Sequence, residues 1–298
     1  MSKLRWATLL VLAMAGIAAM YPIAKILGTS TDPYLLAFFR FFVAAIAILP
    51  IMAYRHSLRL PPKNEWLFFL FLGICAVIPT VCIAIGIVHT NSLVSAILIN
   101  TNPLIVALLA PFLIAEHMTP KKALALAVGF AGVVFVVLNG HGIASLLNSD
   151  YFFGSTILML GALLTAFFTM YTKVSVRKYE GLYVTFFSVA LGSTILALVV
   201  GIRGGFASMP EMTPAVLASL LTLGIVATAI PYVIRSSSMK HLDAHTAASY
   251  HLLIPVFAAF YSFLFLSESF TVWMLIGLVL TSVGVYIVQR EEKIVSGI

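Results

Sequence analysis

The chain has 298 residues, of which 62% are apolar and only 9% are charged, and its formal net charge is +7. Soluble domains typically contain about 25% charged residues, so this composition excludes a soluble globular protein of this size. A membrane β-barrel would show alternating segments of about ten residues, whereas the apolar runs here are continuous and about twice as long. We therefore expect an all-α polytopic membrane protein.

Ten apolar stretches, each long enough to cross a bilayer, follow one another with short connections. They lie at residues 6–27, 33–54, 66–88, 92–116, 121–138, 152–173, 180–202, 214–236, 244–266 and 271–289. Turn and capping residues stand at their ends. Thr119 followed by Pro120, for example, predicts the N-cap and first residue of the fifth helix. The sequence thus predicts ten transmembrane helices.

Basic residues gather on alternate connections. Of the 17 Lys and Arg residues, 14 fall in segments on the side of the N-terminus and one, Arg203, on the other side. The remaining two, Lys25 and Arg40, lie within predicted spans. The positive-inside rule then predicts a multi-pass membrane protein with both termini in the cytoplasm. This topology explains the net positive charge. We therefore expect the lipid bilayer as a partner and no binding of nucleic acid.

The fourth predicted span is repeated later in the chain. Ser92–Glu116 matches Ala244–Glu268 at a spacing of 152 residues, which aligns the prolines and the final glutamates. Because five spans is an odd number, the second copy must have the opposite orientation in the membrane. The charges agree, since Lys121 and Lys122 follow the first copy whereas the aligned residues of the second copy are uncharged.

This pattern divides the chain into two inverted five-helix repeats. We expect the first repeat at 1–138, an outer linker at 139–151, the second repeat at 152–290 and a cytoplasmic tail at 291–298. Two halves of opposite topology are typical of secondary transporters, in which the binding site lies near the membrane midplane at the interface between repeats. A repeat retained only for packing is the alternative.

Polar residues stand within the two copies where lipid-compatible residues would be expected. Asn100 and Asn102 lie in the first copy, and Tyr250 and His251 lie in the second. By helix rise, both pairs approach the middle of the bilayer from opposite sides. Each pair precedes a proline that frees a backbone carbonyl. We interpret them as a substrate-binding site, with hydrogen bonding between helices as the alternative.

Four prolines occur at equivalent positions of the two halves and are predicted to act as helix hinges: Pro79, Pro103, Pro231 and Pro255. Further residues are predicted to line the cavity that these bends create: Thr80, Tyr232, Tyr21 and Tyr171. Anchoring of the tyrosines at the membrane interface is the alternative for the last two.

Arg40 lies about 10 Å below the outer surface in the second span, by the rise of a helix. A charge inside a membrane suggests a functional role, so we expect Arg40 to face the substrate path. The alternative is that an ion pair or hydrogen bonds to backbone carbonyls satisfy it.

Two pairs of charged residues could act as alternating gates, Lys25 with Glu268 outside and Lys173 with Glu116 inside. The alternative is that each glutamate stabilises the N-terminus of the helix that follows it.

No Asp or Glu residue falls in the middle of a predicted span. We expect His251 to be a titratable side chain deep in the membrane. The fixed charges near the path are positive, so anionic or zwitterionic solutes fit better than organic cations. The sequence contains no Gly-rich phosphate loop, HExxH motif or nucleophile elbow. We therefore predict no enzymatic activity, no catalytic residue, no metal site and no cofactor.

The chain resembles the EamA family of the drug/metabolite transporter superfamily. The marks of the resemblance in the first half are Lys25, Pro33 with Arg40, Pro103 with Glu116, and Gly129 with Gly132. In the second half they are Pro255 with Glu268, Gly277 and Gly284. The resemblance implies a ten-helix inverted-repeat fold with a central cavity, and export or exchange of amino acids and related metabolites across the plasma membrane.

Taken together, the sequence predicts a secondary-active carrier, an exporter or exchanger, for a small polar metabolite such as an amino acid, working by alternating access. One alternative is an antiporter of a phosphate- or nucleoside-bearing metabolite, and another is a non-transporting membrane scaffold. The oligomeric state stays open and a monomer is possible. Small residues on the fifth and tenth spans, Ala125, Gly129 and Gly277, could pack either within the chain or between chains.

Overall fold

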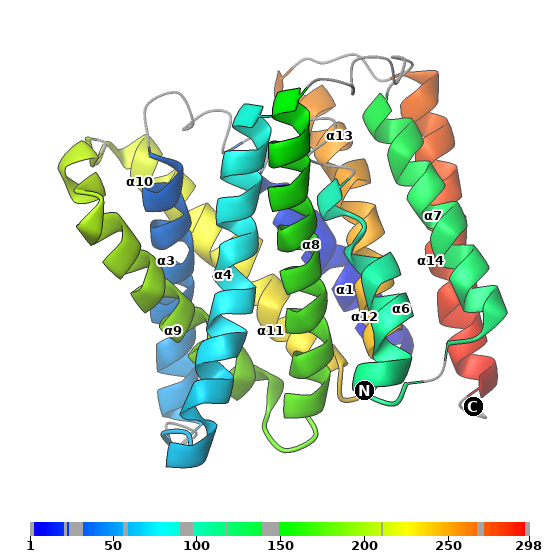
Figure 1. The fold of residues 1–298 in the computed structure, drawn as a ribbon, viewed down its shortest axis with the longest axis horizontal. Helices are drawn as coiled ribbons and strands as arrows, with labels where there is room; N and C mark the ends of the chain where they lie inside the picture. Colours follow the sequence, from blue (N-terminus) through cyan, green and yellow to red (C-terminus); the bar gives the residue numbers. More distant parts are fainter. Residues whose placement is uncertain are drawn as a thin grey trace. The chain divides into compact units, whose positions relative to one another are not determined.

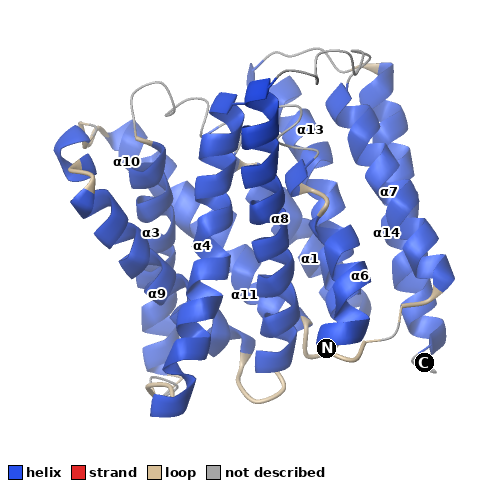
Figure 2. Cartoon of the chain, in the orientation of Figure 1, coloured by secondary structure: helices blue, strands red, loops and turns tan. Residues whose placement is uncertain are grey.

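The computed structural model describes residues 3–20, 23, 32–55, 59–89, 98–116, 118–138, 149–209, 211–266 and 271–295. Over these ranges the chain forms helices and short connections, with no β-strand (Figures 1 and 2). The prediction of an all-α protein is confirmed. The expected site residues Tyr21, Lys25 and Glu268 lie outside the described residues.

The helices of the described residues form ten consecutive stretches, in agreement with the predicted number. The first five are α1 (Lys3–Ala18), α3 (Pro33–Tyr54), α4 (Trp66–His89, preceded by the 3-10 turn η1, Lys63–Glu65), α6 (Asn102–Leu113) and α7 (Pro120–Leu138). The second five are α8 (Ser149–Ser175), α9 (Gly181–Ile202, followed by η3, Gly205–Ser208), α10–η4–α11 (Pro214–Leu221, Thr222–Ala229, Ile230–Ser238), α12–η5–α13 (Ala244–Ser249, Tyr250–Leu253, Ile254–Leu266) and α14 (Val272–Val295). Within the described ranges, five helices are long and apolar enough to cross a membrane.

Two compact units make up the chain, and each takes segments from both halves of the sequence. Unit 1 contains Met1–Val81 and Thr172–Lys240, and unit 2 contains Cys82–Tyr171 and His241–Ile298. The predicted boundaries at residues 138 and 152 concern the sequence repeat, which is a different division of the chain, and they stay a prediction.

In unit 1, α3 packs against α9 and η4, and α1 packs against α11. Helices α4 and α9 approach closely at two glycines, since a Cβ added at Gly73 would lie 2.9 Å from the backbone N of Gly192. Outside the spans, Lys178 and Tyr179 both donate hydrogen bonds to the Glu65 carboxylate and so connect η1 with the end of α8. Burial is the main reason that the pKa of Tyr179 is raised, and its hydrogen bond to the carboxylate adds to the effect.

In unit 2, the main packing is between α7 and α14. A Cβ added at Gly284 would lie 2.7 Å from Gly129 Cα, and one added at Gly132 would lie 2.7 Å from Gly277 O. The absence of side chains at these positions lets the two backbones approach, as small residues do in membrane helix pairs. The small residues of the fifth and tenth spans therefore pack within the chain in this structure, and the oligomeric state stays open.

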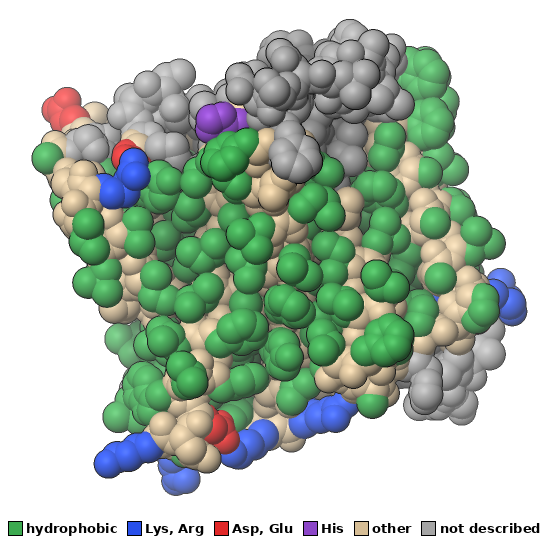
Figure 3. Space-filling view, viewed as in Figure 1, with side chains coloured by type: hydrophobic (Ala, Val, Ile, Leu, Met, Phe, Trp, Pro, Cys, Tyr) green, Lys and Arg blue, Asp and Glu red, His purple; other side chains and the backbone are tan. Residues whose placement is uncertain are grey.

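The hydrophobic side chains visible in the space-filling view cover the middle of the helices, while Lys and Arg side chains lie toward helix ends (Figure 3). Many large apolar side chains are exposed, including Phe112 at 82% and Ile202 at 87%. Such exposure would be costly in water, at about 25 cal/mol per Å² of apolar area, but is favourable against hydrocarbon. The surface is thus suited to a bilayer.

Three of the four predicted hinge prolines lie at the start of a helix that follows an irregular turn. Pro103 is in the first turn of α6, Pro231 follows the π-helical segment η4, and Pro255 follows the 3-10 segment η5. Pro79 lies inside α4. Proline lacks an N–H and fixes φ, so it is tolerated best in the first turn of a helix. The fourth and ninth predicted spans are therefore interrupted rather than continuous helices.

Candidate functional site

The first predicted polar cluster lies at the N-terminus of α6. Asn100 and Asn102 are buried, at 3% and 1% exposure. The Thr101 hydroxyl donates to Leu98 O at 2.7 Å, and the Asn102 amide donates to Ile99 O at 3.4 Å. Since a carbonyl can only accept, the amide atom that faces Ile99 O is Nδ2, and Oδ1 points away from it. Asn102 Oδ1 has no hydrogen-bond partner among the described residues.

The second predicted cluster lies in η5, between α12 and α13. Tyr250 and His251 are buried, at 1% and 6% exposure, and His251 Nδ1 lies 3.2 Å from Ala248 O. The 3-10 winding precedes Pro255, whose missing N–H interrupts the α-helical ladder. Both clusters belong to unit 2, and α12 packs against α6.

Arg40, on α3 in unit 1, is 6% exposed and is held by three groups of that unit. Its Nε donates to Thr228 Oγ1 at 2.6 Å, Nη2 donates to Ala227 O at 3.3 Å, and Nη1 lies 3.3 Å from Met20 Sδ. Ala227 and Thr228 lie in the last turn of the π-helix η4, in which backbone hydrogen bonds join residues five apart. Thr228 Oγ1 donates to Leu223 O. A π-helical turn is often found at functional sites, and here it presents a hydroxyl and a carbonyl to the guanidinium.

The other predicted wall residues are half-buried. Tyr232, on α11, packs its ring edge against Phe41 at 6.1 Å between centroids. Tyr171, on α8, contacts Phe167 at 6.3 Å, and Thr80 lies on α4 next to Pro79. Their role in lining a substrate path stays a prediction.

Of the four predicted gating residues, Glu116 and Lys173 are described. Lys173 is half-buried in the last turn of α8. Glu116 is 8% exposed, and its two oxygens accept hydrogen bonds from Ala244 N at 3.0 and 2.8 Å. The carboxylate therefore stabilises the N-terminus of α12, which is a different helix from the one that directly follows it in sequence. Its predicted pairing with Lys173 stays a prediction.

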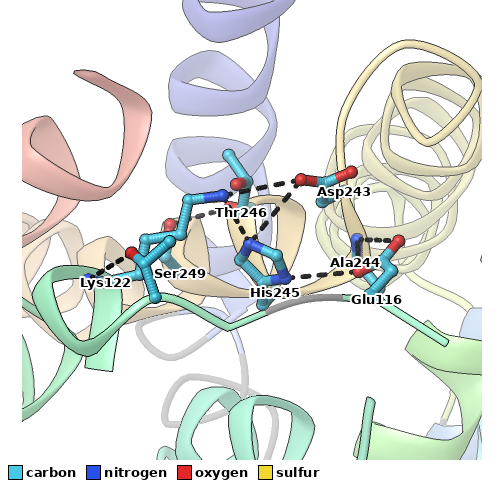
Figure 4. A network of polar contacts seen from close by, with 8 residues as sticks. Glu116, Lys122, Asp243, Ala244, His245, Thr246 and Ser249 are labelled. Carbon is cyan, nitrogen blue, oxygen red and sulfur yellow. Dashed lines mark hydrogen bonds and ion pairs between the residues drawn. The ribbon is translucent and has the colours of Figure 1, made fainter. Parts of the chain in front are cut away.

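Glu116 belongs to a network of polar contacts that the sequence analysis did not identify (Figure 4). We call it the α12 charge cluster, and it consists of Glu116, Lys122, Asp243 and His245. His245 Nδ1 lies 3.2 Å from Glu116 Oε2, Lys122 Nζ lies 2.8 Å from His245 Nε2, and Asp243 Oδ2 lies 3.5 Å from Lys122 Nζ. Lys122 and His245 are each 1% exposed. Every member lies in unit 2.

Turns and helix starts position the members of the α12 charge cluster. Ala115 adopts a left-handed φ of 53°, which turns the chain after α6 and directs Glu116 toward α12. Thr119 Oγ1 accepts from Lys122 N at 3.2 Å, which confirms the predicted N-cap of α7 and fixes Lys122 in its first turn. Asp243 is the N-cap residue of α12. The sequence signal that could have found the cluster is an acidic residue and a histidine two positions apart, Asp243 and His245, at a predicted helix start.

Arg235, on α11, is another residue that the sequence analysis counted only as an inner basic residue, as it did Lys122, and that is buried in the structure. Its side chain is 2% exposed, and its guanidinium carbon lies 5.4 Å from the centroid of the Tyr232 ring. Nearby on unit 1, Thr185 Oγ1 donates to Ser236 Oγ at 2.8 Å. Counting basic residues finds the helix end but cannot distinguish a solvated lysine from a buried arginine.

Comparisons with known proteins place this geometry in a family. The model of the EamA-like transporter family matches residues 4–138 and again 152–290. An uncharacterized transporter of Archaeoglobus fulgidus is 29% identical over 287 residues, which cover 95% of this chain and 97% of the relative. A probable terminal-alkyne amino-acid exporter of Streptantibioticus cattleyicolor is 26% identical over 294 residues, which cover 98% and 95%.

A crystal structure with 15% sequence identity superimposes with a TM-score of 0.81, covering 98% of this chain and 99% of the other, and supports the fold alone. The family and its relatives are named as transporters rather than enzymes. The helices and the family together indicate an integral multi-pass membrane protein. The chain belongs to the EamA-like transporter family, within the drug/metabolite transporter superfamily.

Proposed function

We propose that this family member is a secondary-active exporter or exchanger of an amino acid or a related zwitterionic or anionic solute, working by alternating access. The observation that carries the substrate class is the Asn102 side chain, which is 1% exposed and whose Oδ1 lacks a hydrogen-bond partner among the described residues. A buried acceptor without a donor costs roughly 1–3 kcal/mol. An ammonium or amide N–H of a bound solute would supply that donor.

Two further observations support the same class of solute. Asn100, Tyr250 and His251 add buried polar groups in the same unit, at interruptions in two helices. Polar groups and irregular backbone inside a membrane protein are tolerated where they line a cavity or are buried in protein. A relative with 26% identity across nearly the whole chain is named a probable amino-acid exporter.

Uptake by proteoliposomes tests this proposal against its alternatives. The purified chain is reconstituted, and uptake of radiolabelled L-amino acids is measured with and without unlabelled amino acid inside the vesicles. Saturable uptake that internal amino acid accelerates would support an exchanger or exporter. Saturable uptake of labelled phosphate or nucleotides alone would favour the phosphate- or nucleoside-bearing substrate class, and no saturable flux of any of these would contradict a carrier for them and favour a scaffold.

We also propose that the two halves, 1–138 and 152–290, have opposite orientations in the plasma membrane, with both termini cytoplasmic. Lys121 and Trp273 are equivalent positions of the two halves, and both are at least partly exposed. The native cysteines, Cys75 and Cys82, are buried, so single introduced cysteines can be labelled on their background. K121C should react with a membrane-impermeant maleimide only from the cytoplasmic side, and W273C only from the outside. Labelling of both from one side would contradict the inverted arrangement.

A further inference from the structure

The α12 charge cluster determines where the proton of His245 lies. A lysine ammonium has only donors, so His245 Nε2, at 2.8 Å from Lys122 Nζ, must accept. A neutral imidazole has one donor and one acceptor, so its proton is on Nδ1. Nδ1 lies 3.2 Å from Glu116 Oε2, although its N–H is not aligned with that oxygen for a hydrogen bond. With Lys122 as an ammonium, these distances fit a neutral His245 that carries its proton on Nδ1.

A second proton on His245 is incompatible with this arrangement. Nε2–H would face the Lys122 ammonium at 2.8 Å, so that two donors and two positive charges would meet. Asp243 Oδ2 lies 3.7 Å from His245 Nε2 and 3.5 Å from Lys122 Nζ, so it can accept from either group. Protonation would therefore move Lys122 away from His245 and let the imidazolium turn to Asp243.

The charge balance of the cluster favours such a proton. With neutral His245, the four side chains carry one net negative charge. Glu116, Lys122 and His245 are buried, while the side chain of Asp243 is 40% exposed. Binding one proton makes the group neutral. Further titratable groups stand on the described parts of the elements that surround α12: Lys121 on α7, Tyr250 and His251 on η5, and Tyr286, Arg290 and Glu291 on α14. Lys121 lies 3.5 Å from Glu291, and its side chain is 76% exposed.

We propose that His245 is a proton-binding site, and that proton binding breaks the contact between Lys122 and His245 and leaves Asp243 to accept from both groups. The site lies in the first turn of α12, which continues directly into the η5 segment with Tyr250 and His251. Proton binding would thus be transmitted along one short helix to the predicted substrate site. Only this consequence for flux rests on the proposed function, because the proton site itself is a property of the protein without solute.

Magnetic resonance of the full chain in lipid, labelled with ¹⁵N-histidine, tests the proposal without any solute. The chain has 7 histidines, and the resonances missing in H245Q identify those of His245. We expect the Nδ1–H tautomer at alkaline pH and a second proton when the pH is lowered across the range in which imidazoles titrate. K122M, which removes the ammonium, and E116Q, which removes the carboxylate, should move the midpoint of this titration in opposite directions.

Matched controls separate this mechanism from general damage to the fold. K121M removes the neighbouring lysine, whose side chain is 76% exposed, and should leave the midpoint unchanged. An Nε2–H tautomer, a histidine that gains no second proton over this range, or midpoints of K122M and E116Q that move in the same direction would each overturn the proposal. In flux assays, H245Q should abolish acceleration by a proton gradient while H89Q, at the last residue of α4, retains it, and acceleration that persists in H245Q would overturn the proposed coupling.

Discussion

The Glu116 carboxylate and the backbone N–H of Ala244 meet across 128 residues of sequence, with both carboxylate oxygens within 3.0 Å of the nitrogen. This contact ties the turn after α6 to the start of α12. It places a negative charge at a helix N-terminus, where the exposed N–H groups and the helix dipole favour it.

Loss of this contact should destabilise the protein. We expect E116A to lower the free energy of unfolding by roughly 1–3 kcal/mol, because the cap of α12 and the partner of His245 are removed together. Equilibrium unfolding in mixed detergent micelles measures the change. E211A, at an exposed glutamate before α10, is the control and should differ little from the wild type. Equal stability of the two variants would contradict the capping role.

Arg40 and Thr228 should be energetically coupled. The guanidinium donates to the threonine hydroxyl at 2.6 Å inside unit 1, so removal of either partner leaves the other buried and less well satisfied. In a double-mutant cycle with R40M and T228V, we expect the combined loss of stability to be smaller than the sum of the single losses by roughly 0.5–3 kcal/mol. Strict additivity would show that the contact does not contribute to stability.

Gly132 should tolerate no side chain. A Cβ there would lie 2.5 Å from Thr281 Oγ1 and 2.6 Å from Thr281 N, so G132A must push α7 away from α14. We expect a loss of roughly 1–3 kcal/mol in the free energy of unfolding. G201A provides the matched control, since the nearest atom to its added Cβ is Phe206 Cε2 at 3.8 Å. Similar stabilities of G132A and G201A would contradict close packing of the two helices.

Replacement of Ala115 by glycine should make the protein slightly more stable. Its φ of 53° lies in the left-handed region, which costs an L-residue with a Cβ roughly 1–2 kcal/mol relative to glycine. Part of that gain is offset by the larger entropy of glycine in the unfolded chain. We expect A115G to raise the unfolding midpoint slightly without altering flux. A lower midpoint would mean that the turn is not strained.

The sequence predicted the helix number and class because hydrophobic length and basic-residue bias act locally along the chain. The four polar residues that it singled out in the two copies, Asn100, Asn102, Tyr250 and His251, are all 6% exposed or less, but it did not single out the equally buried His245, Thr246 and Ser249. The π-helix before Pro231 and the 3-10 turn before Pro255 were foreseen only as hinges. Hydropathy does not distinguish these windings from an α-helix.

The α12 charge cluster could not be predicted in the same way. Comparing the two halves pairs residues at equivalent positions, such as Glu116 with Glu268, whereas the cluster joins residues that are not equivalent, such as Lys122 and His245. Lys122 was counted among the basic residues that set the topology, yet its side chain is only 1% exposed. Its ammonium can be buried because it contacts His245 Nε2 and the Asp243 carboxylate. Contacts of this kind depend on how α7 and α12 pack.

The central claim, that the polar cluster at α6 binds the transported solute, is tested most directly by amino-acid counterflow with N102A and the wild type in proteoliposomes. T222V serves as control, since this hydroxyl, on the first residue of η4, donates to Ala218 O one turn earlier at 2.8 Å. We predict that N102A raises KM at least tenfold, which corresponds to about 1.4 kcal/mol, while T222V matches the wild type. Unchanged KM and maximal flux in N102A would contradict the account.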